Sequence, residues 1–150
     1  MDVEKIDEII DGYVDEEGVL IQILLDIQHE LNWIPKESII EVSRRLQIPI
    51  SQIYRVASFY TAMSLTPMGR HLVQVCLGTA CHVRGAPKIL NKVENTLKIK
   101  AGETTEDMMF TLRRVNCLGC CAMGPMIVVD KDYYGKMKTS DVGEILERYE

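Results

Sequence analysis

The chain has 150 residues, of which 47% are hydrophobic and 26% charged, and its formal net charge is −5. This length suffices for one or two small domains with a hydrophobic core, and the acidic balance argues against a nucleic-acid partner, which needs a basic face. No apolar run approaches the roughly 20 residues that cross a bilayer, and the first residues, MDVEKIDEII, are unlike a signal or transit peptide. We therefore expect a cytoplasmic protein that does not insert into the membrane.

The first part of the chain predicts a small helical bundle. Apolar residues recur there every three to four positions in four successive segments, which is the period of an amphipathic helix. We expect these residues to form the core of the bundle: Val3, Ile6, Ile9 and Ile10; Leu20, Ile23, Leu24, Ile27 and Leu31; Ile39, Ile40, Val42 and Leu46; and Ile53, Tyr54 and Ala57. Gly12 is the expected end of the first helix, and Pro35 suits the first turn of the third. Turn residues at 66–69 predict a boundary between a helical domain at 1–68 and a second domain at 69–150.

The second domain predicts alternating strands and helices. The expected strands, from alternating or short apolar runs, lie at residues 71–78, 108–117, 126–130 and 133–137, with a turn at Lys131 and Asp132 between the last two. One helix is expected to open at residues 84–87 and continue to Leu97, and another to follow a cap at Thr139 or Ser140. This order suggests a small α/β sandwich of thioredoxin-like type. The expected fold class is therefore α+β, a helical bundle followed by a thioredoxin-like domain.

All five cysteines of the chain lie in two short runs, CLGTAC at residues 76–81 and CLGCC at residues 117–121. Each run is expected to form a loop after a strand, and the first has small residues between its thiols. Thiolates grouped in pairs are typical ligands of a soft metal or an iron–sulfur cluster. In a compartment that keeps thiols reduced, such grouping indicates metal or redox chemistry rather than a disulfide framework.

Five cysteines are one more than a four-thiolate site needs. Spacing alone does not decide between Cys120 and Cys121, although adjacent side chains diverge and one of the two is expected to be spare. A structural zinc ion also accepts four thiolates, and a thioredoxin-type disulfide between Cys117 and Cys120 is a third interpretation. The position of both runs after α/β-type strands favours a cluster over zinc, and the late position of the CxxC argues against the disulfide.

His82 and Arg84 are candidates for a place beside the site. His82 is next to Cys81 and can replace a thiolate in Rieske centres, but a second histidine is missing near the other run, so we expect it beside the site or at the surface. His29 is expected on a helix face. Arg84 follows the first run, where its charge would raise the potential of a reduced cluster or simply face solvent. The chain has no dinucleotide-binding or P-loop motif and no catalytic triad, so we expect no catalytic residues.

Four stretches carry a resemblance to a known family. They are LIQILLDIQHELNWIP from Leu20, VASFY from Val56, CLGTACHVRGA from Cys76 and RRVNCLGCCAMGPMIVVD from Arg113. In order, over nearly the whole chain, they resemble the small thioredoxin-like [2Fe–2S] subunit of complex I-type NADH dehydrogenases. The resemblance is closer to the corresponding subunit of multimeric NAD(P)-linked hydrogenases and formate dehydrogenases.

The resemblance implies the ligands, the cofactor and the partners. The family pattern is cysteine-x4-cysteine followed by cysteine-x3-cysteine, which makes Cys76, Cys81, Cys117 and Cys121 the ligands of one [2Fe–2S] cluster and leaves Cys120 as the spare thiol. It implies an electron-transfer subunit next to the FMN of a flavoprotein subunit, which also carries the NAD(P)H site and an iron–sulfur cluster. Further iron–sulfur or hydrogenase subunits complete such a complex, and the helical domain is expected to contact the flavoprotein. The alternative function is a zinc-holding structural or assembly module.

Overall fold

The computed structural model describes residues 3–13 and 18–149. By its internal contacts the chain divides into two compact units, Met1–Pro67 and Met68–Glu150. Within the described ranges, every helix is too short or too polar to cross a membrane.

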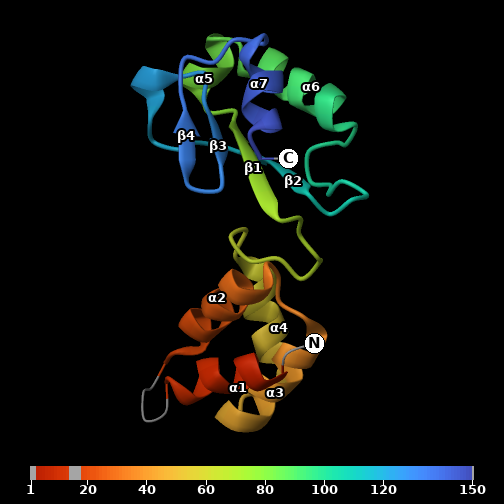
Figure 1. Cartoon of the computed structure of the whole chain (residues 1–150). Helices are drawn as coiled ribbons and strands as arrows, with labels where there is room; N and C mark the ends of the chain where they lie inside the picture. Colours follow the sequence, from red (N-terminus) through yellow and green to blue (C-terminus); the bar gives the residue numbers. More distant parts are fainter. Residues whose placement is uncertain (1–2, 14–17, 150) are drawn as a thin grey trace. The chain divides into compact units, whose positions relative to one another are not determined.

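The described residues of the first unit form four helices, as the periodicity predicts. They are α1 (Val3–Asp11), α2 (Leu20–Leu31), α3 (Lys36–Leu46) and α4 (Ile50–Phe59) (Figure 1). Their core consists of the buried residues Ile6, Ile10, Val19, Ile23, Leu24, Ile27, Ile34, Ile39, Val42, Ile53, Ala57 and Met63. Most of these are core residues that the sequence predicts. The side chain of Val3, also expected there, lies outside the described part.

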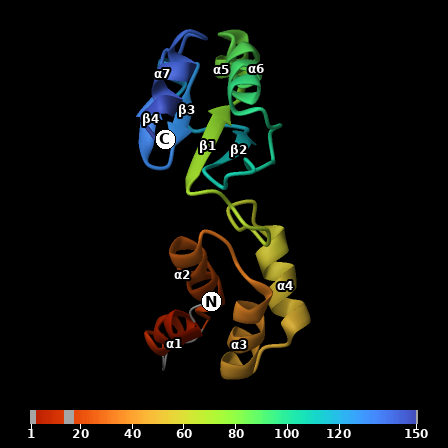
Figure 2. The same ribbon diagram turned by 45° about the vertical axis from the view of Figure 1, so that its right-hand side comes forward.

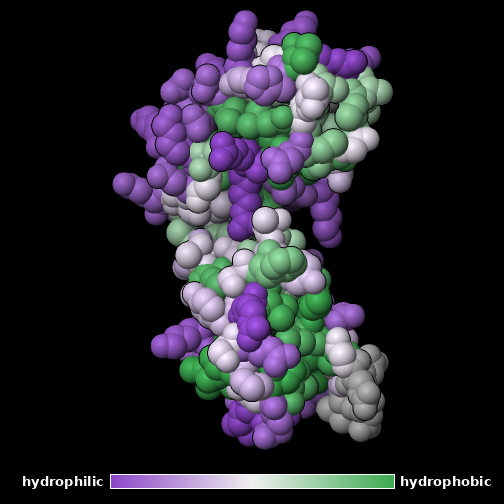
Figure 3. Space-filling model, turned by 180° about the vertical axis from the view of Figure 1, so that it is seen from behind, coloured by the Kyte–Doolittle hydropathy of each residue, from purple (hydrophilic) through white to green (hydrophobic). Residues whose placement is uncertain are grey.

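The expectation that Ile40 and Tyr54 belong to this core is wrong. Ile40 is 47% exposed and Tyr54 55% exposed, because each lies about 100° around its helix from the buried Ile39 or Ile53, on the side away from the core. Figure 3 shows several apolar side chains at the surface of the helical unit. Its exposed large apolar residues are Ile21, Leu25, Ile40, Ile50, Tyr54, Phe59 and Tyr60.

Polar side chains connect the elements of the helical unit. Arg45 of α3 reaches α1, with Nη2 at 2.7 Å from Asp7 Oδ1 and Nη1 at 2.5 Å from Asp11 Oδ1. Gln28 of α2 donates to the carbonyl of Ala62 at 2.6 Å and accepts from the amide of Ser64 at 2.5 Å. The chain that follows α4 is thereby attached to α2.

The second unit is a sheet covered by helices on one face. Its strands are β1 (His71–Cys76), β2 (Phe110–Val115), β3 (Ile127–Val129) and β4 (Asp132–Tyr134), in the order β2-β1-β3-β4. β1 is parallel to β2 and antiparallel to β3, and β3 is antiparallel to β4 (Figures 1 and 2). The helices are α5 (Thr79–Val83), α6 (Ala86–Leu97) and α7 (Asp141–Glu147), with a 3₁₀ turn, η1 (Cys121–Met123). The predicted α+β fold class is confirmed.

The core of the sheet unit follows from the alternation along its strands. Alternate residues of three strands point to one face, where they pack against α6 and α7. These are Val73 and Val75; Phe110 and Leu112; and Ile127 and Val129, opposite Ile89, Val93, Val142, Ile145 and Leu146.

Local predictions differ from the structure in three places. Cys81 is expected in a loop but lies on α5, a short helix that the sequence pattern does not reveal. The hairpin turn lies at Asp130 and Lys131, one residue earlier than predicted, because Asp130 adopts a left-handed conformation with φ 55°. Ser140 precedes α7, but its hydroxyl does not cap the helix and instead contacts Asp141 Oδ1 at 2.9 Å.

Candidate metal centre

The sheet topology brings the two cysteine runs to one edge. Cys76 is the last residue of β1 and pairs with Val115, the last residue of β2. Because these strands are parallel, the segments that follow them leave the sheet at the same edge. The amide of Leu77 donates to the carbonyl of Val115 at 2.8 Å, which continues the pairing beyond the strands.

The first run holds its thiols in the protein interior. Cys76 is 3% exposed at the end of β1, and Cys81 is 2% exposed on α5. Gly78 precedes this helix, and its carbonyl accepts from the amide of His82 at 2.8 Å. The four residues between the two thiols therefore comprise a short turn and the start of a helix.

The second run is more open. Cys117 and Cys121 are exposed, whereas Cys120 is half-buried. Gly119 has φ +76°, a conformation that favours glycine, and its amide donates to Cys117 Sγ at 3.3 Å. The thiol of Cys120 donates to the carbonyl of Leu118 at 3.6 Å and packs beside the small apolar cluster that contains Met126. The three thiols of this run thus differ in surroundings.

Two glycines let the runs approach each other. A Cβ at Gly78 would lie 2.6 Å from the carbonyl oxygen of Asn116 and 3.5 Å from the Cα of Cys117. A Cβ at Gly124 would lie 2.8 Å from Cys81 Sγ. Each glycine therefore provides space that a neighbour in the other run occupies.

Two of the thiols, Cys81 and Cys121, have raised pKa values because of their surroundings. Burial, followed by the hydrogen bond with Cys76 and the charges of Cys76 and Cys121, raises the pKa of Cys81 to about 11. The hydrogen bond with Cys117, followed by its charge, burial and the charge of Cys76, raises the pKa of Cys121. Such thiols stay protonated at neutral pH until a bound cation displaces their protons.

This arrangement fits a two-iron group. A [2Fe–2S] cluster takes its thiolates in pairs, one pair on each iron, and the hydrogen bonds couple Cys76 with Cys81 and Cys117 with Cys121. Among the described residues, no group of three or more His, Cys, Asp or Glu side chains is arranged to hold a metal ion.

The other residues considered from the sequence have varied positions. His82 is exposed on α5, and His29 is exposed on α2 in the helical unit. His71 lies at the start of β1, where its Nδ1 is 2.7 Å from Asp130 Oδ2. Arg84 follows α5 and donates through Nη1 to the carbonyl of Cys121 at 2.7 Å, a contact that the sequence does not predict.

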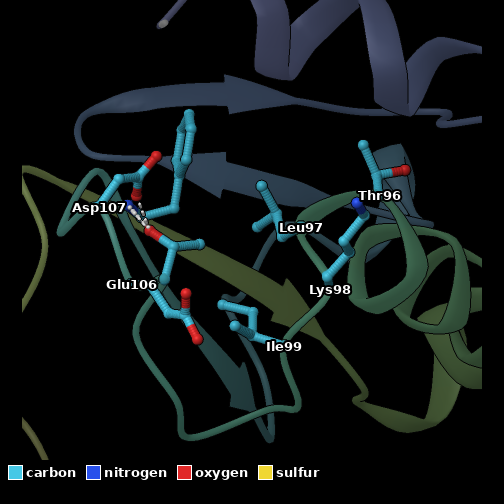
Figure 4. Close-up of a pocket in the computed structure, with 8 residues that line it drawn as sticks. Thr96, Leu97, Lys98, Ile99, Glu106 and Asp107 are labelled. Carbon is cyan, nitrogen blue, oxygen red and sulfur yellow. Dashed lines mark hydrogen bonds between the residues drawn. The ribbon is translucent and has the colours of Figure 1, made fainter.

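A hollow elsewhere in the sheet unit does not involve the cysteine runs. Figure 4 shows it between the end of α6 and the loop before β2. Its lining residues are Thr96, Leu97, Lys98, Ile99, Thr105, Glu106, Asp107 and Phe110. Asp107 is engaged locally, since it accepts from the amide of Met109 at 3.0 Å.

A thioredoxin-like sheet whose parallel strands end in two pairs of thiols defines an iron–sulfur protein of the ferredoxin class. The family model of the thioredoxin-like [2Fe–2S] ferredoxins matches residues 6–150, and the chain belongs to this family. Its cofactor is one [2Fe–2S] cluster. The predicted family and cofactor are confirmed.

Individual relatives match most of the chain. The sequence is 34% identical over 142 residues to the HndA component of an NADP-reducing hydrogenase of Solidesulfovibrio fructosivorans, covering 95% of this chain and 83% of that protein. It is 35% identical over 146 residues to a subunit of the NADH-quinone oxidoreductase of Escherichia coli K12, covering 97% of this chain and 88% of that protein. A solved structure of an NAD+-reducing [NiFe]-hydrogenase in the air-oxidized state is similar in fold, with a TM-score of 0.74 at 18% identity. That match covers 87% of this chain but 22% of the hydrogenase chain.

Proposed function

We propose that the chain is an electron-transfer subunit of an NAD(P)-linked oxidoreductase complex and catalyses no reaction alone. The observation that carries the proposal is the meeting of two thiol pairs at one sheet edge in a [2Fe–2S] ferredoxin fold. Relatives that span nearly the whole chain, a hydrogenase subunit and an NADH-quinone oxidoreductase subunit, support the kind of complex.

The proposed ligands are Cys76, Cys81, Cys117 and Cys121. Their support is that, after burial, Cys76 and Cys121 raise the pKa of Cys81, and that Cys117 and then Cys76 raise the pKa of Cys121. Cys120 is proposed to be spare, which is supported by the hydrogen bond of its thiol to the carbonyl of Leu118. The cysteine-x3-cysteine spacing of the resembled family also supports Cys121, rather than Cys120, as the ligand.

The proposed ligands differ in exposure, and this gives the site a direction. Cys76 and Cys81 are buried, and Cys117 and Cys121 are exposed. When bound, the cluster supplies a site for one electron at a time. Cys76 and Cys81 lie on the buried side of the site, and the exposed Cys117 and Cys121 leave its other side open to a redox partner.

The proposed partner is a flavoprotein subunit with FMN, an NAD(P)H site and its own iron–sulfur cluster. Further iron–sulfur or hydrogenase subunits would complete the complex in the cytoplasm, where thiols stay reduced. The helical unit is the proposed contact with the flavoprotein. Its exposed apolar residues, Phe59 at 76% and Tyr54 at 55% among them, support this role.

The deciding experiment is an absorption spectrum with iron, zinc and acid-labile sulfide analysis on protein purified without oxygen. We expect two irons and two sulfides per chain and a red-brown colour that bleaches with dithionite. A colourless protein with one zinc ion would overturn the proposal in favour of a structural module. Co-purification with an FMN-containing subunit tests the partner separately, and a chain isolated without any flavoprotein would contradict that part.

A further inference from the structure

The side chain of Arg84 connects the two cysteine runs. Arg84 is the residue directly after α5, the helix that carries Cys81, and its amide closes the helix on the carbonyl of Ala80 at 3.3 Å. Its Nη1 reaches the second run and donates to the carbonyls of Cys121 at 2.7 Å and Ala122 at 3.3 Å. The side chain of Arg84 therefore links α5, which carries the buried Cys81, to the backbone of the exposed Cys121.

The segment that Arg84 contacts has little internal support. η1 comprises three residues, Cys121–Met123, and a single 3₁₀ turn is marginal without tertiary contacts. The amide of Gly124 also donates to the carbonyl of Cys121, at 3.2 Å. A hydrogen bond from a charged donor is about twice as strong as a neutral one. The carbonyl of Met123 accepts from the amide of Lys136 at 2.6 Å, so Arg84 is one of two contacts that fix this turn from outside, and it is the one that reaches Cys121.

We propose that Arg84 is a positioning residue that holds the second cysteine run against the first, and that its charge raises the reduction potential of the cluster. The inference rests on the proposed function. Reduction adds negative charge at the site, and a fixed cation nearby stabilises the reduced form. Arg84 is exposed, so solvent and salt weaken this effect without removing it.

The test compares three variants after anaerobic loading with iron and sulfide. Arg84→Gln removes the charge and the long reach, and Arg84→Lys keeps the charge but not the planar guanidinium. Arg70→Gln is the matched control, since Arg70 is an exposed arginine that precedes β1 at the end opposite Cys76, about 20 Å away at roughly 3.3 Å per residue. Two readouts are measured, the rate of iron release to a chelator and the midpoint potential in a dithionite titration.

Arg84→Gln is expected to release iron about tenfold faster than the parent chain. At the parent midpoint potential, its ratio of reduced to oxidised cluster is expected to fall about threefold. Arg84→Lys should keep the parent potential and release iron at an intermediate rate, and Arg70→Gln should match the parent in both. Failure of Arg84→Gln to load, with Arg84→Lys loading, also supports the positioning role.

Parent-like release and potential in Arg84→Gln would overturn the inference alone, since the parent chain has then bound its cluster. An equal fall in potential in Arg84→Lys and Arg84→Gln would overturn the role of the charge. A parent chain that takes up neither iron nor sulfide would overturn the proposed function and this inference together.

Discussion

The helical unit and the sheet unit both contain ion pairs, and they differ in the groups gathered where the two cysteine runs meet. In the helical unit, charged residues pair with one another, as Arg45 does with Asp7 and Asp11. In the sheet unit, thiols gather at the edge of the sheet where β1 and β2 end, and Arg84 donates to a backbone carbonyl beside them. All five cysteines belong to the sheet unit. The difference teaches that substitutions in the two units should be separable, one set affecting the packing of helices and the other affecting the cluster.

Removal of a proposed ligand should have the largest effect. Cys76→Ala or Cys117→Ala is expected to lose the cluster completely, because the four-thiolate site then lacks one iron ligand. Iron content and visible absorption after anaerobic purification measure this. Cys120→Ala is the matched control and should keep both at the parent level.

Either cysteine result can break the assignment. A full cluster spectrum in Cys117→Ala would remove Cys117 from the ligands. Loss of iron in Cys120→Ala, with retention in Cys121→Ala, would show that the neighbouring thiol is the ligand.

A core substitution in the helical unit tests whether that unit can be destabilised without affecting the cluster. Ile23 is fully buried, and Ile23→Ala is expected to lower the free energy of unfolding of that unit by about 2–5 kcal/mol through the cavity it leaves. Trp33, the only tryptophan of the chain, lies in the helical unit and reports its unfolding in urea by fluorescence. The exposed neighbour Ile21 supplies the control, since Ile21→Ala should change stability by about 0.5 kcal/mol at most. A changed cluster spectrum in Ile23→Ala would break the comparison.

A methyl group at Gly124 should disturb the cysteine site less than removal of a proposed ligand does. Its Cβ would lie 2.8 Å from Cys81 Sγ, so either the sulfur or the backbone must move. We expect Gly124→Ala to destabilise the sheet unit by about 1–3 kcal/mol and to load less iron than the parent chain. Gly143→Ala is the control, because nothing lies within 4 Å of the added methyl and alanine favours the helix. Equal iron loading in the two variants would show that the space beside Cys81 is not needed.

The smallest expected effect is on the pH dependence of the stability of the helical unit. Hydrogen bonds from Arg44, and then from Arg45, lower the pKa of Glu41 from 4.5 to about 2. The stability that ionised Glu41 contributes is therefore present above pH 4.5 and is lost as the pH falls through about 2. We expect Glu41→Gln to cost about 0.5 kcal/mol at pH 7 and to flatten the pH dependence of Trp33-detected unfolding in this window. An unchanged pH dependence would exclude Glu41 as its source.

Much of the fold could be predicted from the sequence, because long periodic segments determine it. The four helices of the first unit repeat apolar residues over two or more turns, and the strands of the second alternate or stay apolar. α5 could not be predicted because five residues are too few to show a helical period. The exposure of Ile40 and Tyr54 could not be predicted either, because apolar character alone does not fix which side of a helix faces its neighbours.

The site could be predicted only in part. The grouping of cysteines after two strands indicates a cluster, and parallel pairing of those strands brings the runs together. Spacing does not separate Cys120 from Cys121, because their directions depend on the left-handed Gly119 and the 3₁₀ turn that follows. The contacts of Arg84 with Cys121 and of Gly124 with Cys81 join residues far apart in the chain, and no local pattern reports them.

The meeting of two distant runs at one edge also affects how the chain folds. Bridged by the proposed ligands, Cys76 and Cys117 would close a loop of about 40 residues that contains α6 and β2. For a covalent cross-link of that loop length, the loss of chain entropy in the unfolded state stabilises the folded state by about 4 kcal/mol. The cluster would then act as a reversible cross-link between the two cysteine runs. Iron could be bound by all four thiols only after β1 and β2 have paired, so metal insertion would select chains that have already folded.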